Sequence, residues 1–170
     1  MRHRALLIAG VAASLLAIGA DSVGAAPCWR PPVTGQIADH FRVPPCPYCA
    51  GNRGIEYRTA TSAVVRSVEA GRIVFSGPVA GVGYVVVEHR NGWRLTYGRL
   101  REVSVRRGDV VARSAVLGTT DRGFHFGLRV GGAYRDPEPH FGRLVGRPRL
   151  VPIDGTLRRP PPAGFFVCRP

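Results

Sequence analysis

The sequence contains no lysine, so all 24 of its basic side chains are arginine. Acidic side chains are also scarce, at 11, which gives the whole chain a formal net charge of +13. Two explanations are open: the base composition of the genome, or an anionic partner such as a cell-wall polymer, lipid head groups or nucleic acid. The composition therefore allows an anionic partner but does not identify it.

After its first residues the sequence has no apolar run long enough to span a bilayer. The one long run, "ALLIAGVAASLLAIGA", has 16 residues and follows a basic start that contains Arg2 and Arg4. This pattern, with small residues after the run, is typical of a secretory signal peptide, which we place at residues 1–26. An uncleaved anchor is the alternative. We expect a secreted or cell-envelope protein after removal of the signal peptide, which makes nucleic acid the least expected partner.

Cysteine is also infrequent, with four residues that all follow the leader: Cys28, Cys46, Cys49 and Cys168. In an exported protein an even number of cysteines favours disulfides, and four cysteines allow three pairings. We favour Cys46–Cys49 and Cys28–Cys168, the second of which would join the two ends of the mature chain. The motif "CPYC" also occurs in redox enzymes, but no amphipathic helix or βαβ pattern accompanies it here. A structural clip is therefore the preferred interpretation of this pair.

No stretch of about eleven residues or more shows a helical period. Short segments rich in Val, Ile, Phe and Tyr occur instead, and glycine-containing turns separate them. We expect an all-β fold, an antiparallel β-sandwich or barrel of short strands. We place a Pro/Cys-rich segment at residues 27–50, the β-sheet core domain at 51–142 and an Arg/Pro-rich C-terminal tail at 143–170.

Alternation of apolar and polar residues assigns faces to two of the expected strands. In "GFHFGLRV", residues 123–130, every second side chain is apolar, so we expect His125 on the opposite, polar face. In "GWRLTYGRL", residues 92–100, the same alternation predicts that Tyr97 and Arg99 share a face.

Several ordered segments carry a family resemblance: "NRGIE" at 52–56, "GRIVFSGPVAGVGYVVVEHRNG" at 71–92, "RLTYGRL" at 94–100, "VRRGDVVARSAVLG" at 105–118 and "GFHFGLR" at 123–129. From about residue 33 to residue 141, the chain resembles the lysostaphin/LytM-type zinc peptidases of bacterial cell walls, peptidase family M23. The ending is most similar to that of actinobacterial members. The resemblance implies the LytM β-fold, also described as a duplicated hybrid motif.

The same resemblance implies which positions would carry the chemistry. Such peptidases bind zinc through "H-x-G-x-D" and the second histidine of "H-x-H", and two further histidines serve the bound water and the transition state. The three metal positions correspond here to Asn52, Glu56 and His125, and the two remaining positions to Arg99 and Gly123. Of the five, only His125 matches the family pattern.

These substitutions alter what the site can do. A catalytic zinc takes about three protein ligands from His, Cys, Asp and Glu, whereas Asn52 offers a neutral amide and Glu56 a longer side chain than aspartate. An arginine at position 99 stays protonated and cannot act as a base, and Gly123 has no group that transfers a proton. Glu56 is then a better partner for an arginine, Arg53, Arg58 or Arg99, than for a metal. We expect a degenerate site with no cofactor and no catalysis, the alternative being an active zinc-dependent peptidoglycan endopeptidase with atypical ligands.

The face that carries these positions can still bind a ligand. Arg99 and Arg129, with Tyr97 and either Tyr57 or Trp93 nearby, suit an anionic peptide or glycan, because arginine and carboxylate form directional pairs. We therefore expect peptidoglycan or another anionic cell-wall polymer as the partner, or a wall hydrolase that the protein regulates.

Overall fold

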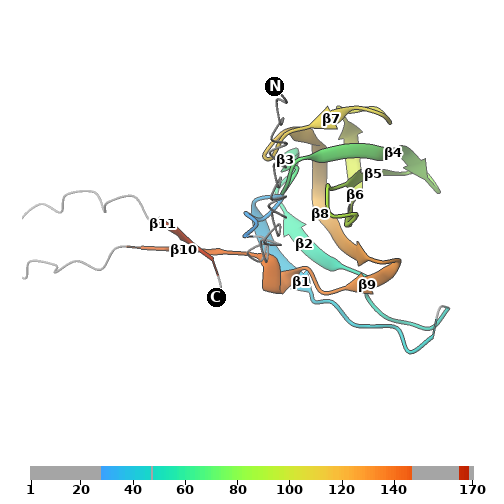
Figure 1. Cartoon of the computed structure of the whole chain (residues 1–170), viewed down its shortest axis with the longest axis horizontal. Helices are drawn as coiled ribbons and strands as arrows, with labels where there is room; N and C mark the ends of the chain where they lie inside the picture. Colours follow the sequence, from blue (N-terminus) through green and yellow to red (C-terminus); the bar gives the residue numbers. More distant parts are fainter. Residues whose placement is uncertain (1–27, 47, 147–164, 169–170) are drawn as a thin grey trace, which may run out of the picture.

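One curved antiparallel sheet dominates the computed structural model, which describes residues 28–46, 48–146 and 165–168 (Figure 1). In the described residues one 3₁₀ helix, η1 (Glu138–His140), is the only regular helical element. The sheet consists of β1 (Gly35–Asp39), β2 (Ile55–Thr59), β3 (Ala63–Arg66), β4 (Gly71–Val79), β5 (Val82–Glu88), β6 (Arg94–Val103), β7 (Val110–Val111), β8 (Val116–Val130) and β9 (Ala133–Arg135). The expected all-β antiparallel fold is confirmed.

The order of the strands brings distant segments together. The sheet runs β1-β2-β8-β6-β5-β4-β7, and β3 and β9 both pair with β8 as well. β8 is the longest strand, at 15 residues, and contacts four other strands along its length. Segments that begin at residues 55 and 94 therefore meet on the two sides of the segment around residue 125.

The core lies on one face of the sheet because every second side chain of the central strands is apolar. Leu95 and Tyr97 of β6 are fully buried, as are Phe124, Phe126 and Leu128 of β8. Burial of a large apolar side chain stabilises a fold by about 1.5–3 kcal/mol, so these residues fix which face of each strand points inward. His125 consequently lies on the opposite face, as predicted.

The hairpin between β4 and β5 shows how local sequence sets the register. Val79 and Val82 are paired, which leaves only Ala80 and Gly81 in the loop. Both loop residues have positive φ, 49° and 81°, as a tight hairpin turn of the right twist requires.

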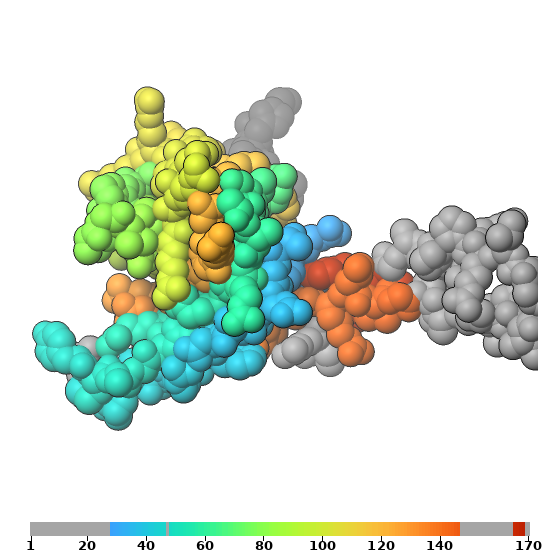
Figure 2. Space-filling view, turned by 180° about the vertical axis from the view of Figure 1, so that it is seen from behind, coloured from blue at the N-terminus to red at the C-terminus, as the bar shows by residue number. Residues whose placement is uncertain are grey.

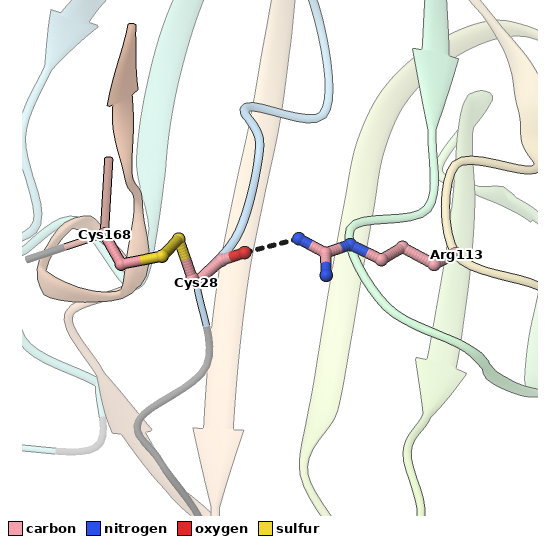
Figure 3. The surroundings of a disulfide bond; sticks show 3 residues. All are labelled: Cys28, Arg113 and Cys168. Carbon is pink, nitrogen blue, oxygen red and sulfur yellow. Dashed lines mark hydrogen bonds between the residues drawn. A yellow bond between two sulfur atoms is a disulfide. The ribbon is translucent and has the colours of Figure 1, made fainter. Parts of the chain in front are cut away.

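The N-terminal part of the described chain is held by Trp29. Its backbone forms a bridge to Phe141 and exchanges hydrogen bonds with His140 and Gly142, and its side chain is 1% exposed. The neighbouring Cys28 is bonded to Cys168, and the Arg113 guanidinium donates to the Cys28 carbonyl oxygen (Figure 3). The second disulfide joins Cys46 to Cys49, so both favoured pairings are confirmed.

The C-terminal tail forms a separate two-stranded ribbon, β10 (Arg143–Val145) with β11 (Phe165–Val167). The ribbon extends away from the sheet (Figures 1 and 2). At the other end, β1 already belongs to the sheet, although it precedes residue 51, where we placed the start of the core. The signal peptide expected at residues 1–26 lies outside the described residues. Within the part that is described, no helix has the length and hydropathy of a membrane span.

Candidate functional site

The candidate residues meet on the polar face of the sheet, which we define by the outward side chains of β2, β8, β6 and β5. Pairing of these strands places four positions in one row: Glu56 opposite His125, His125 opposite Gly98, and Gly98 opposite Tyr84. Strand register alone therefore brings two of the three predicted metal positions side by side.

Glu56 is the centre of this row. Its Oε1 accepts a hydrogen bond from Nδ1 of His125 at 2.7 Å. Its Oε2 is buried, has no hydrogen bond among the described residues, and lies 3.5 Å from Nε of Arg99. The Glu56 and His125 side chains are only 18% and 19% exposed. The expected pairing of Glu56 with an arginine is thus confirmed, and Arg99 is the partner.

Arg99 reaches Glu56 because of an irregularity in β6. Its φ is 61°, and the pairing of β6 with β8 shifts register between Gly98 and Leu100. A bulge of this kind turns the next side chain to the other face. The prediction that Tyr97 and Arg99 share a face is therefore wrong: Tyr97 is fully buried, and Arg99 is exposed on the polar face.

Gly123 completes the surroundings of Arg99. A Cβ added at Gly123 would lie 3.6 Å from Nη1 of Arg99 and 3.9 Å from the Tyr57 carbonyl oxygen. The absence of a side chain at this position leaves open space beside the guanidinium. Gly123 contributes room to the site and no chemical group.

The amide of Asn52, the third predicted metal position, is engaged by the backbone. Nδ2 donates to the His40 carbonyl oxygen at 3.1 Å, and Oδ1 accepts from the Gly54 N–H at 3.3 Å. Its own backbone N–H and C=O pair with Arg42. With 7% exposure, Asn52 is a buried structural residue that closes the loop between β1 and β2.

The aromatic residues of the site differ from those expected. Tyr57 and Tyr97 are buried in the core, and burial raises the pKa of both hydroxyls. Neither ring is therefore available on the polar face, which corrects the proposed role of Tyr97 in binding. Tyr84 takes that place: a Cβ at Gly98 would lie 2.4 Å from its Cε1 atom, so the ring lies over the glycine next to His125.

Arg129 lies further along the same face, four residues after His125 on β8. Its Nε and Nη2 atoms donate to the Gly132 carbonyl oxygen at 3.3 and 3.1 Å. Its guanidinium also stacks on the ring of Tyr134 at 5.0 Å from the centroid. These contacts hold the arginine in place with part of its guanidinium uncommitted.

The other three histidines of the described residues have partners elsewhere. Nδ1 of His40 pairs with Glu138 at 2.6 Å, which raises the pKa of His40. His89 is buried with Nδ1 2.6 Å from the Ala70 carbonyl oxygen, and burial lowers its pKa. His140 packs against Trp29, and burial lowers its pKa as well.

The "CPYC" segment lies in the loop that Asn52 closes. The Cα atoms of Cys46 and Cys49 are 5.0 Å apart, and the Cys49 N–H donates to the Cys46 carbonyl oxygen. Within the described residues no helix begins at this pair, which removes the usual cause of a lowered thiol pKa. The geometry supports a loop clip.

The donor set can be compared with what a catalytic zinc needs, which is about three ligands and an open position. Asn52 is engaged by the backbone, Glu56 and His125 are bonded to each other, and a guanidinium lies beside them. Among the described residues, no group of three or more His, Cys, Asp or Glu side chains is arranged to hold a metal ion. The residues present do not fit the zinc site of the resembled peptidases.

Comparison with known proteins places this fold. A family model described as Peptidase family M23 matches residues 50–137, just over half of the 170 residues. No curated protein matches the chain.

Solved structures show the same fold at low identity. Csd3 from Helicobacter pylori is 21% identical with a TM-score of 0.61, over 68% of this chain and 35% of that one. This chain therefore spans about a third of the Csd3 chain. A chain of the SpoIIIAH–SpoIIQ complex is 22% identical with a TM-score of 0.58, over 65% and 97% of the two chains. The catalytic domain of lysostaphin from Staphylococcus simulans is 18% identical with a TM-score of 0.54, over 62% and 90%.

The family match covers β2 to β9 and includes all the positions gathered around Glu56. The solved structures agree with it in fold. This chain belongs to peptidase family M23.

Proposed function

We propose that this chain is an exported M23 protein that binds peptidoglycan through its polar face without hydrolysing it. The observation that carries the proposal is the Glu56–His125–Arg99 network. The Arg99 guanidinium lies beside the Glu56 carboxylate and supplies the positive charge that a bound metal ion would otherwise supply. The proposal therefore treats the site as degenerate.

Hydrolysis by a zinc peptidase needs a metal-bound water, and among the described residues the network does not leave three free ligands for the metal. Nδ1 of His125 is occupied by Glu56, and Glu56 itself faces two donors. Arg99 stays protonated, and Gly123 has no side chain. Loss of one acid–base group typically costs about 10²–10⁴ in rate, and two are missing here.

Binding, unlike hydrolysis, needs no group that activates water. Arg99 and Arg129 offer exposed guanidinium groups, and Tyr84 offers a ring over Gly98 on the same face. Peptidoglycan stem peptides carry carboxylates, which form directional pairs with arginine. A protein that occupies wall peptides in this way also lies where it can regulate a true wall hydrolase, which is the protein partner we propose.

One experiment on the disulfide-bonded protein without its leader tests the proposal. The protein is incubated with purified sacculi, with and without added zinc, and both its cosedimentation and the released muropeptides are measured. We expect cosedimentation that weakens at high salt, and no release under either condition. Arg99→Gln, which removes the charge and keeps a polar side chain, should weaken cosedimentation.

The contrary outcome is equally clear. Stoichiometric zinc that survives dialysis, together with muropeptide release that a chelator abolishes, would establish an active endopeptidase with atypical ligands. Failure to sediment with sacculi at low salt would remove the wall-binding function.

A further inference from the structure

Two arginines face each other on the polar face at a distance from Glu56. Arg94 of β6 and Arg129 of β8 are direct cross-strand partners. Like charges in this relationship destabilise a sheet, whereas opposite charges stabilise it. In the part of the chain that the structure describes, one acidic side chain lines a cavity beside them: Glu88 of β5, the cross-strand partner of Arg94 on its other side.

A third arginine comes to the same place from the loop between β6 and β7. Arg94, Arg107 and Arg129 line one cavity of about 430 Å³ together with Glu88. Three cations and one carboxylate leave this cavity with an excess of positive charge. An anion bound there would offset the repulsion that the bare cluster carries.

Two of the three guanidinium groups, those of Arg94 and Arg129, are held in position for such an anion. Nε of Arg94 donates to Glu88 at 2.7 Å, which leaves its two terminal nitrogens uncommitted. Arg129 is fixed by the Gly132 carbonyl oxygen and by Tyr134, as described above. Among the described residues, the guanidinium of Arg107 forms no hydrogen bond or ion pair, so this arginine can still adjust to an anion. Groups that are already oriented lose less entropy when a ligand binds.

The walls of the cavity indicate which anion fits. Val74, Phe75 and Val86 line one side, and Phe75 is 38% exposed. Thr96 also lines the cavity, and its cross-strand partner Gly127 adds no side chain. An apolar wall beside cations suits a carboxylate attached to small alkyl side chains better than it suits a bare phosphate.

We propose that Arg94, Arg107 and Arg129 form a subsite for the carboxylate of a peptide with small apolar side chains. That such a peptide comes from the wall rests on the proposed function; the subsite itself rests on the cavity. Four residues of β8 separate Arg129 from His125, a distance of about 13 Å at the usual rise per residue. An extended peptide of about four residues would therefore reach from this subsite to Glu56 and Arg99.

The test uses N-acetyl-Ala-Ala with a free carboxylate and its C-terminal amide as paired probes. Binding is followed by NMR through the Thr96 and Gly127 amides and the arginine Nε–H signals. We expect the carboxylate form to bind at least about tenfold more tightly than the amide, and Arg94→Gln and Arg129→Gln each to reduce that affinity about fivefold. Arg143→Gln, which removes one charge on the remote β10 strand, is the matched control and should leave the affinity unchanged.

Three results would count against the subsite. Equal binding of acid and amide would show that no carboxylate is recognised. If inorganic phosphate bound as tightly as the dipeptide, the cavity would be a general site for oxyanions and not a peptide subsite. If Arg143→Gln lowered the affinity as much as Arg129→Gln, the binding would depend on the net charge of the protein and not on these three arginines. Dipeptide binding without sedimentation on sacculi would uphold the subsite and refute the wall function. Sedimentation on sacculi without dipeptide binding would uphold the wall function and refute the subsite.

Discussion

The carboxylate of Glu56 and the imidazole of His125 are joined at 2.7 Å across β2 and β8, and both side chains are mostly buried. Arg99 lies against the second carboxylate oxygen at 3.5 Å. One acidic side chain thus holds both a histidine and an arginine in position. The stability of this region depends on that carboxylate.

Replacement of Glu56 measures this dependence. We expect Glu56→Ala to lower the free energy of unfolding by about 1–3 kcal/mol, because it leaves the His125 N–H without a partner. Glu56→Gln should cost less, because the amide oxygen can still accept from His125. Urea unfolding gives both values, with Glu102→Ala at an exposed position as the control. An equal effect of the alanine and glutamine variants would contradict the assigned hydrogen bond.

Restoration of the family ligands tests what Arg99 does. Asn52→His with Glu56→Asp supplies two ligands of the family type beside His125. The Arg99 guanidinium stays next to the carboxylate position, so we expect this double variant to bind little zinc. Addition of Arg99→Ala removes the competing cation and should bring zinc binding close to one ion per chain. Zinc content after dialysis is the measurement, and equal zinc in the two variants would show that Arg99 does not occupy the cation's place.

Two glycines near the site should respond very differently to alanine. A Cβ at Gly54 would lie 2.4 Å from the Phe126 carbonyl oxygen and 2.7 Å from Cε1 of His125. Gly54→Ala should therefore push β2 away from β8 and destabilise by about 2 kcal/mol. Gly123→Ala meets nothing closer than 3.6 Å and should stay within about 0.5 kcal/mol. Thermal unfolding of the two variants is the measurement. Equal destabilisation by both would show that alanine is unfavourable at either position and that the close packing at Gly54 is not the cause.

His89 should make stability depend on pH. Burial lowers its pKa below the ordinary value of about 6.5, so the unfolded chain binds the proton more readily. Its contribution to stability is complete above about pH 6.5 and is lost as the pH falls through the folded pKa. His89→Gln should therefore flatten the fall in unfolding free energy between about pH 6.5 and pH 5.

A second histidine acts in the opposite sense and provides the control. Glu138 raises the pKa of the exposed His40. Its contribution is complete below about pH 6.5 and is lost as the pH rises through the folded pKa. His40→Gln should leave the acid limb of the curve in place. If it flattened that limb and His89→Gln did not, the assignment would be wrong.

The two disulfides should contribute unequally. A disulfide stabilises the fold because it lowers the entropy of the unfolded chain. For a loop of 140 residues this stabilisation reaches up to about 5 kcal/mol, and for a loop of 3 residues about 1.6 kcal/mol. Replacement of Cys28 and Cys168 by serine should therefore destabilise far more than the same change at Cys46 and Cys49. Chemical denaturation of the two double variants gives the comparison.

The strand alternation in residues 123–130 predicted the buried and exposed faces of β8, because a period of two is a property of the sequence itself. The same count failed at Arg99, since a bulge adds a residue that no pattern in "GWRLTYGRL" marks. Tyr84 was missed for a related reason. Its place over Gly98 depends on a neighbouring strand, although the alternation of Tyr84 with buried Val85 in "GYVVVE" is a signal that could have indicated its face.

A turn role for Asn52 is what a polar residue between Gly51 and Gly54 predicts, and the hydrogen bond from the Gly54 N–H agrees with it. The bond to the His40 carbonyl oxygen could not be predicted, because that partner lies twelve residues earlier. A loop residue between glycines has several uses, and only the folded chain shows that both ends of this amide are occupied. The opposite charges of glutamate and arginine were enough to predict that Glu56 pairs with an arginine. The choice of Arg99 over other arginines required the register of β2, β8 and β6.

The bond between Cys28 and Cys168 also has a mechanical consequence. A pull on the segments that flank these two residues would pass from one to the other through the sulfur atoms. The sheet between them would carry none of that load, and its hydrogen bonds would not be the first to yield. A chain pulled at these two residues would therefore keep the hydrogen bonds of its sheet, and with them its polar face, intact.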